Sequence, residues 1–356
     1  MSKTSVNLLK SLCEAHSVPG YEDEVRQIFA SELQDRGELY TDGSGSVFCE
    51  NGEGPRVMVA GHMDEVGFRV QNITRDGFLQ FVTLGGWWSH TLLSQRVVVK
   101  NRAGQKVLGV ISSKPPHFLS AEARNRVMDT SEMFIDIGAC SQQEAVERYG
   151  ISLGDPICPQ SEFTQLANPD LFMAKAFDNR VGMACAIEVA AQLDEHPNCL
   201  VACGTVQEEL GLRGAKTAAA KAKPDVVIVL EGPPADDTPG FNPADSQGRL
   251  GGGVQIRMHD PSAMMNPKLV DFAVSTAVAE GIPYQVTVRT SGGTDAGSFH
   301  LAEQGIPCIV LGVPSRYIHS HNGIININDY QDMLRLAKAM VRGLNQGAVD
   351  QLTTYL

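Results

Sequence analysis

The chain has 356 residues, of which 43% are hydrophobic, and it carries a formal net charge of −12 at pH 7. This length suggests two domains, and the acidic balance argues against nucleic acid or an anionic membrane surface as a partner. No apolar run approaches the roughly 20 residues that a membrane span needs, and the N-terminus lacks a signal-peptide core. The eight cysteines are scattered without a CxxC pair, which indicates buried thiols in a reducing cytoplasm.

The first third of the chain predicts helices and then a change to β-structure. Two amphipathic helices are expected over about 5–15 and 22–36, and short strands around 46–50 and 56–64. From about residue 65 the pattern becomes β-rich. Two turns with the sequences "RDG" and "RAG" predict hairpins there, and the capping-box pattern "SQQE" predicts one short helix.

From about residue 166 onward, helices and apolar strands alternate, which is typical of an α/β domain with a largely parallel sheet. Helices are expected over 178–193, 214–222, 267–281 and 327–347, and strands over 200–206, 225–231, 284–290 and 306–313. The first strands are expected to join this sheet. The predicted fold is therefore an α/β domain, formed by residues 1–64 and 166–356 with helices on both faces of a mainly parallel sheet, interrupted by a β-rich insertion over 65–165.

Side chains that bind metals follow the predicted strands. In open α/β sheets, sites form beyond the carboxyl ends of the strands, and a His, Asp or Glu stands at each of these ends. Imidazole and carboxylate without thiolate form the ligand set of a divalent ion such as Zn, Co or Mn. The candidates are His62, Asp64, Asp178, Glu208, Glu209, Glu231, His319 and, less favoured, His321.

Each candidate also has a simpler interpretation. Asp178 could be the N-cap of its helix, Glu208 and Glu209 could pair with Arg213, and Glu231 could be a solvated loop residue. A single histidine at a strand end is more often hydrogen-bonded than a metal ligand. The metal interpretation rests on the joint occurrence, because all these positions fall at one end of one predicted sheet.

Five ordered motifs then resemble a known family across the whole chain. The motifs are "GHMDEVG", "KAFDNRVG", "VQEELGLRGA", "PADDTPG" and "RYIHS". Together they resemble the M42 family of dinuclear metallo-aminopeptidases, which includes the tetrahedral TET peptidases and glutamyl aminopeptidases. The family belongs to the wider M20/M28-like clan of zinc exopeptidases.

The resemblance implies a role for each matching position. His62 and Glu231 would bind one cation, Glu209 and His319 the second, and Asp178 would bridge both. Two cations some 3.5–4 Å apart acidify a bridging water. The chain departs from the commoner pattern in having Glu231 where relatives carry Asp, and in having "HNGI" after "RYIHS", where many relatives carry a Glu.

Three further residues are expected near this site. Glu208 would be the general base, because adjacent residues at a strand end point in different directions. Asp64 lies two residues after His62, so it could orient the imidazole; alternatively it is a loop residue that faces water. The loop 290–299 is similar to a family loop near the site, so Gly293 and Asp295 are candidate substrate contacts, although this loop could also be a simple glycine-rich turn.

The predicted function is a cytoplasmic, metal-dependent aminopeptidase that releases N-terminal residues from short peptides. The alternative is another two-metal amidohydrolase, such as a deacylase or a carboxypeptidase-like enzyme. A glycosidase or a metal-binding regulator fits the adjacent glutamates less well. The resemblance also implies that the insertion forms dimers that build a dodecamer. Trp87 and Trp88 could lie at such an interface, or could equally belong to a core.

Overall fold

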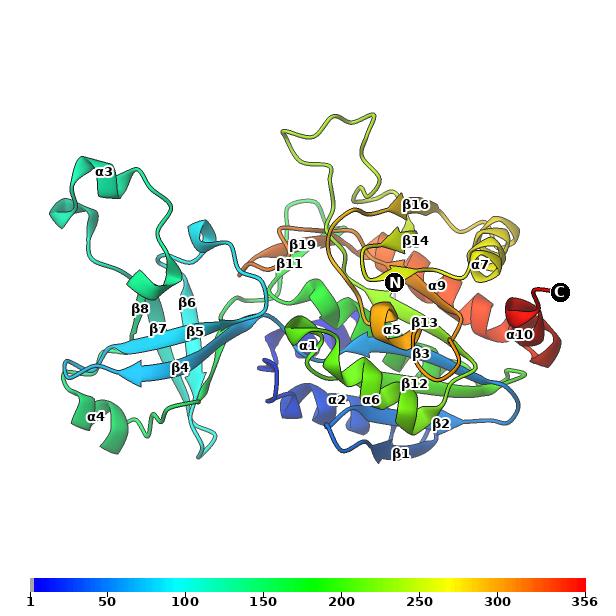
Figure 1. The fold of residues 1–356 in the computed structure, drawn as a ribbon, viewed down its shortest axis with the longest axis horizontal. Helices are drawn as coiled ribbons and strands as arrows, with labels where there is room; N and C mark the ends of the chain where they lie inside the picture. The colour runs from blue at the N-terminus through cyan, green and yellow to red at the C-terminus, as the bar shows by residue number, and fades with distance from the viewer. Residues whose placement is uncertain (1–2) are drawn as a thin grey trace.

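The computed structural model describes residues 3–356 and has two lobes (Figure 1). The larger lobe is layered, with a nine-stranded sheet flanked by helices, and the smaller lobe is a closed six-stranded barrel. In Figure 1 the barrel stands apart at the left, and the sheet with its helices fills the right. The predicted combination of an α/β domain and a β-rich insertion is confirmed.

Four parallel strands form the centre of the large sheet, in the spatial order β12-β3-β13-β17. Antiparallel strands flank them, so the whole sheet is mixed. The first strands join it as expected. The strands are β1 (Glu38–Thr41), β2 (Val47–Asn51), β3 (Arg56–His62), β12 (Cys199–Thr205), β13 (Val226–Glu231), β14 (Val254–Asp260), β15 (Ala263–Met264), β16 (Tyr284–Val288) and β17 (Cys308–Gly312).

Helices cover both faces of this sheet. The central helix α5 contacts β3, β12 and β13, together with α1, α2 and α9 on the same face, whereas α6 and α8 pack together on the opposite face. The helices are α1 (Lys3–Glu14), α2 (Asp23–Leu33), α5 (Phe177–Gln192), α6 (Arg213–Ala222), α7 (Pro267–Ala279), α8 (Ala296–Phe299), α9 (Ile327–Gly343) and α10 (Gln346–Thr353).

Helix α5 lies unusually close to the sheet because two glycines face each other there. A Cβ atom added to Gly61 in β3 would stand 2.7 Å from the carbonyl carbon of Gly182 in α5. The helix is buried on nearly every side. This close approach brings the first turn of α5 over the ends of the parallel strands, where the candidate residues lie.

The barrel has the strand order β4-β5-β8-β7-β6-β9, and its strands span residues 67–159. Both predicted hairpins, β4–β5 and β6–β7, are present. Short helical turns decorate it, among them α3 (Ala121–Arg124) and α4 (Gln142–Glu147). Its strands are β4 (Gly67–Ile73), β5 (Leu79–Leu84), β6 (Arg96–Lys100), β7 (Lys106–Ser112), β8 (Phe134–Asp136) and β9 (Pro156–Pro159).

The two tryptophans after β5 differ in their surroundings. Trp87 is partly buried against the apolar core of the barrel, so the core alternative holds for this residue. Trp88 has 66% of its surface exposed. Of the two tryptophans, therefore, only Trp88 is exposed enough to lie at an interface between subunits.

A small third sheet links the two lobes, with the order β10-β11-β19-β18. Its strands are β10 (Thr164–Gln165), β11 (Leu171–Ala174), β18 (Ser315–Arg316) and β19 (Gly323–Asn326). Neither this sheet nor β14 is predicted from the sequence. The predicted final helix is two helices, because α9 ends at Gly343 and Asn345 caps α10. Among the helices of residues 3–356, none has the length and apolar character needed to cross a membrane.

Candidate metal centre

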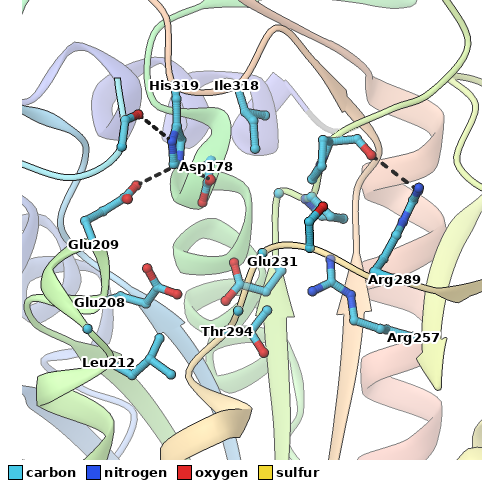
Figure 2. A pocket seen from close by; sticks show the side chains of 18 residues that line it. Asp178, Glu208, Glu209, Leu212, Glu231, Arg257, Arg289, Thr294, Ile318 and His319 are labelled. Atoms are coloured by element: carbon cyan, nitrogen blue, oxygen red, sulfur yellow. Dashed lines mark hydrogen bonds and ion pairs between the residues drawn. The ribbon is translucent and has the colours of Figure 1, made fainter. Parts of the chain in front are cut away.

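The predicted ligands come together at one edge of the large sheet. His62 ends β3 and Glu231 ends β13, while Glu208 and Glu209 follow β12. These three strands are parallel neighbours, so their carboxyl ends meet. Figure 2 shows the three glutamates of this cluster, with Asp178 above them at the start of α5.

Asp178 lies between two imidazoles and presents one oxygen to each. Its Oδ1 is 3.1 Å from Nε2 of His62, and its Oδ2 is 3.4 Å from Nε2 of His319. Asp178 has a non-helical backbone, and Asn179 performs the capping instead, since its Oδ1 accepts a hydrogen bond from the backbone N–H of Gly182 at 3.0 Å. The N-cap interpretation of Asp178 is therefore wrong.

Glu208 and Glu209 lie on a single turn of 3₁₀-helix, Glu208–Leu210, rather than on the end of a strand. Successive residues of such a helix point about 120° apart, so the two carboxylates still diverge. Glu209 Oε1 is 3.4 Å from Nε2 of His319, whereas Glu208 Oε2 is 3.9 Å from Nε2 of His62. Figure 2 shows Glu209 directed toward His319 and Glu208 directed toward Glu231.

The simpler interpretations of the three glutamates find no support. Within residues 3–356, Arg213 forms no ion pair with either adjacent glutamate, and its guanidinium contacts the side chain of Gln207 instead. Glu231 is 4% exposed, so it is not a solvated loop residue. Its Oε2 is 3.8 Å from Nε2 of His62.

Asp64 is buried and holds the backbone of the glutamate turn. Its two carboxylate oxygens accept hydrogen bonds from the N–H groups of Glu208 and Glu209, at 3.0 and 3.1 Å. The nearest partner of His62 Nδ1 is the backbone carbonyl of Asp64 at 3.0 Å, while the Asp64 carboxylate is 3.6 Å away. Asp64 is thus not a loop residue that faces water, and it contacts both His62 and the adjacent glutamates.

His319 is oriented by a residue that the sequence does not indicate. Its Nδ1–H donates a hydrogen bond to the carbonyl oxygen of Gly86 at 2.8 Å, and Gly86 lies two residues after the end of β5 in the barrel. His321 does not join the cluster and is buried against the ring of Trp87 instead.

The cluster holds more negative than positive charge, and this shows in its pKa values. Burial raises the pKa of Glu208, Glu209 and Glu231 above that of an ordinary carboxyl. Burial lowers the pKa of His319, but the hydrogen bonds with Asp178 and Glu209 outweigh it and raise the pKa to about 11. The centre therefore favours uptake of positive charge, either as protons or as metal cations.

The donors fit divalent cations. Two groups of three side chains, His62 with Glu208 and Glu231 and His62 with Asp178 and Glu209, each place one ligand atom per residue within 4.8 Å of the others. Oε1 of Glu231 is buried without a hydrogen-bond partner, and Oε1 of the buried Glu209 has only the ion pair with His319 at 3.4 Å. Buried carboxylate oxygens are costly unless they are paired or bind a metal, so a cation pair would compensate the charge of both glutamates and supply the partner that Glu231 Oε1 lacks.

A cavity of about 480 Å³ opens onto this cluster. Two arginines, Arg257 and Arg289, line its far wall. Arg257 donates to Asp260 at 3.0 Å and Arg289 donates to Asp236 at 2.7 Å. The other lining residues include Leu212, Pro233, Pro234, Gly293, Thr294 and Ile318.

The two predicted substrate contacts occupy different places. Gly293 lines the cavity. Asp295 is 1% exposed and lies outside the cavity lining, where its Oδ2 accepts a hydrogen bond from the hydroxyl of Thr205 at 2.5 Å. The glycine-rich loop therefore reaches the cavity through Gly293 and Thr294.

Comparison with known proteins identifies the family of the chain. A family model described as M42 glutamyl aminopeptidase matches residues 45–336. The glutamyl aminopeptidase of Lactococcus lactis subsp. cremoris (strain MG1363) is 36% identical over 354 residues, covering 98% of each chain. The crystal structure of a TET aminopeptidase from the marine sediment archaeon Thaumarchaeota archaeon SCGC AB-539-E09 is 40% identical, with a TM-score of 0.96 over 99% of both chains.

A second structure adds information on assembly. The TET1 peptidase of Pyrococcus horikoshii, which can assemble into a tetrahedron or a large octahedral shell, is 30% identical with a TM-score of 0.84. The match covers 96% of this chain and 100% of that one. Together these matches confirm the resemblance of the five motifs, and the chain belongs to the M42 peptidase family.

Proposed function

We propose that this protein is a two-metal aminopeptidase that hydrolyses the N-terminal residue of short peptides. The position of Asp178 carries the proposal, because its two oxygens face two different imidazoles, as a carboxylate that bridges two cations must. His62 and Glu231 would bind one cation together with Asp178, and Glu209 and His319 would bind the other. Zn, Co and Mn are the ions that suit these ligands.

Glu208 is the proposed general base. When bound, two divalent cations supply Lewis acidity for the scissile carbonyl and lower the pKa of a water molecule. The Glu208 carboxylate then accepts the proton of the attacking water and donates it to the leaving amine. Asp64 fixes the backbone of this turn by accepting hydrogen bonds from the N–H groups of Glu208 and Glu209, so the base and its neighbouring ligand are held on one turn.

The far wall of the cavity favours an acidic first residue of the peptide. Arg257 and Arg289 line the cavity, whereas their partners Asp260 and Asp236 are not among the lining residues. A substrate side chain that extends along this wall meets guanidinium donors before it meets either carboxylate. Guanidinium groups bind carboxylates with charge-assisted hydrogen bonds, so Glu or Asp is favoured there over Lys.

The experiment that tests this function combines metal removal with a panel of aminoacyl-anilides. A chelator should abolish hydrolysis, and Zn, Co or Mn should restore it. Acetylation of the substrate amine should abolish turnover, because an aminopeptidase needs a free amine; a deacylase would retain or gain activity. Full activity in metal-stripped protein contradicts the proposal.

We further propose that the barrel mediates self-association into dimers that build a dodecamer, and that the protein acts in the cytoplasm. The tetrahedral assembly of the TET1 relative supports the first part, as does the exposure of three large apolar side chains in the same lobe, Trp88, Phe118 and Val127. Eight free cysteines, seven of them buried, suit a reducing compartment. Sedimentation that shows only monomer at micromolar concentration would refute the proposed assembly but would not bear on the proposed catalytic activity.

A further inference from the structure

The segment that leaves the barrel after β5 reaches the metal centre from outside the α/β layers. Its sequence is Gly85-Gly86-Trp87-Trp88. The carbonyl oxygen of Gly86 accepts the hydrogen bond of His319 Nδ1 at 2.8 Å, across 233 positions of sequence. An imidazole that binds a cation through one nitrogen is oriented by the group that accepts from its other nitrogen.

His319 depends on this contact more than His62 depends on any single partner. The side chain of His62 is 1% exposed and is enclosed by carboxylates, whereas that of His319 is 33% exposed. His319 also has a left-handed backbone, with φ 55°, which is a conformation that non-glycine residues adopt only when their surroundings enforce it. Gly86 provides the hydrogen bond on the side of the ring that faces away from the carboxylates.

Trp87 fixes Gly86 in place. Its indole Nε1–H donates to the carbonyl oxygen of Gly67 at 3.0 Å, and its ring stacks on Phe68 with 4.7 Å between the ring centres. Gly67 and Phe68 are the first residues of β4, so the indole is anchored to the barrel wall. On the other side, the ring of His321 lies 5.7 Å away, which places Trp87 between the barrel and the segment that carries His319.

We infer that Trp87 is a positioning residue, which acts through Gly86 on the orientation of His319 and so sets the affinity of the second cation. The barrel is then part of the metal centre, although it supplies no ligand. This inference rests on the proposed function, because it assumes that His319 binds a cation. Trp88 has no such role: it is exposed, and among residues 3–356 its aromatic contact is with the exposed ring of His90.

The test compares Trp87→Ala with Trp88→Ala, a matched control one residue away. Stepwise affinities for Zn and Co are measured on metal-stripped protein by competition with a chromophoric chelator, and His319→Ala identifies which step belongs to the second cation. Trp87→Ala should weaken that step about 10- to 100-fold, the usual effect of removing a group that orients a ligand. The other step should be unchanged, and Trp88→Ala should leave both unchanged.

Circular dichroism and thermal melting establish that each variant is folded. If Trp87→Ala does not fold, Trp87→Phe replaces it, since Phe keeps the stacking but loses the bond to Gly67 and should weaken the second step several-fold. Unchanged affinity in a folded Trp87 variant, or an equal loss in Trp88→Ala, overturns the inference while the proposed function stands. A wild-type protein that binds no pair of cations overturns both.

Discussion

The α/β layers and the barrel bury different kinds of side chain. In the barrel, between residues 67 and 159, the polar side chains that are buried are Asn101 and Asp155, and each accepts hydrogen bonds from a neighbouring turn. The α/β layers bury carboxylates, imidazoles, a lysine and arginines, and many of these gather at the ends of β3, β12 and β13. Burial of charge opposes folding unless the charge is compensated. The gathering of buried charged side chains at these strand ends therefore indicates that the functional site lies there.

The largest effects are expected when the two adjacent glutamates at this end of the sheet, Glu208 and Glu209, are replaced one at a time. Glu208→Gln removes the proton acceptor with almost no change in volume, so kcat should fall on the order of 10²–10⁴-fold while both cations stay bound. Glu209→Gln replaces an anionic ligand by a neutral amide, so the second cation should bind more weakly and excess metal should recover part of the activity. Metal analysis of the purified variants beside their kinetics measures both effects.

The reversed pattern, with metal lost from Glu208→Gln and retained in Glu209→Gln, would exchange the two roles. Either glutamate could hold a cation on geometry alone, because Glu208 also forms a group with His62 and Glu231. Full activity in both variants would mean that the carboxylates are structural.

A second prediction concerns stability at the junction of the two regions. Glu65 is 1% exposed, and its carboxylate pairs with Lys175 at 2.6 Å and Arg180 at 3.0 Å. Glu65→Gln leaves two cations buried with a neutral partner, so the free energy of unfolding should fall by about 3–5 kcal/mol. Denaturant unfolding measures it, with Glu50→Gln as control.

Glu50 pairs with Arg56 at 2.6 Å, but both side chains remain about a quarter exposed. Its replacement should cost about 1 kcal/mol or less. Equal losses in the two variants would contradict the view that burial determines how much the loss of one partner of an ion pair costs.

A third prediction concerns the selectivity of the cavity. Arg289→Gln removes one guanidinium from the far wall, so the preference in kcat/KM for a Glu- over a Leu-anilide should fall about tenfold, the equivalent of one charge-assisted hydrogen bond. Arg316→Gln is the control, because Arg316 pairs with Asp237 of the same loop but does not line the cavity. An unchanged preference in Arg289→Gln would remove this arginine from substrate recognition.

A fourth prediction concerns the pH dependence of a contact between the regions. Glu24 in α2 pairs with Lys100 and Lys106 of the barrel at 2.8 and 3.0 Å. Burial raises the pKa of Glu24, but hydrogen bonds from both lysines and from the backbone of His16 outweigh it and lower the pKa to about 2.

A carboxyl with a folded-state pKa below its unfolded value stabilises the protein above the unfolded pKa of about 4.3 and loses this effect as pH falls toward 2. Glu24→Gln should therefore be about 1–2 kcal/mol less stable than wild type at pH 7, with the difference shrinking between pH 4.5 and 2.5. Urea unfolding at these pH values measures it. A constant difference would show that the lysine contacts do not set this pKa.

The sequence predicts the centre of the fold well because its signals are local. Hydrophobic periodicity predicts apolar strands such as 225–231, and turn residues predict the two hairpins. The candidate ligands are then expected to lie together, because the carboxyl ends of parallel strands meet at one edge of the sheet. The strand β14 is missed because its residues Gln255, Arg257 and Asp260 are polar yet buried, and only tertiary partners explain them. The small third sheet is missed because its strands are two to four residues long.

The parts of the site that escape prediction are long-range backbone contacts. The bond between Gly86 and His319 joins segments 233 positions apart, and Asp64 binds backbone N–H groups 144 and 145 positions away. A backbone carbonyl or N–H carries no residue-type signal, so no pattern in a single sequence can indicate it. The domain boundaries and the roles of the individual site residues remain predictions.

Anomalous diffraction from crystals soaked with Zn or Co tests the central claim most directly. The account predicts two peaks on either side of Asp178, one beside His62 and Glu231 and the other beside Glu209 and His319. A single peak, or a pair in which the Asp178 carboxylate contacts only one ion, would contradict the two-metal centre proposed for this protein.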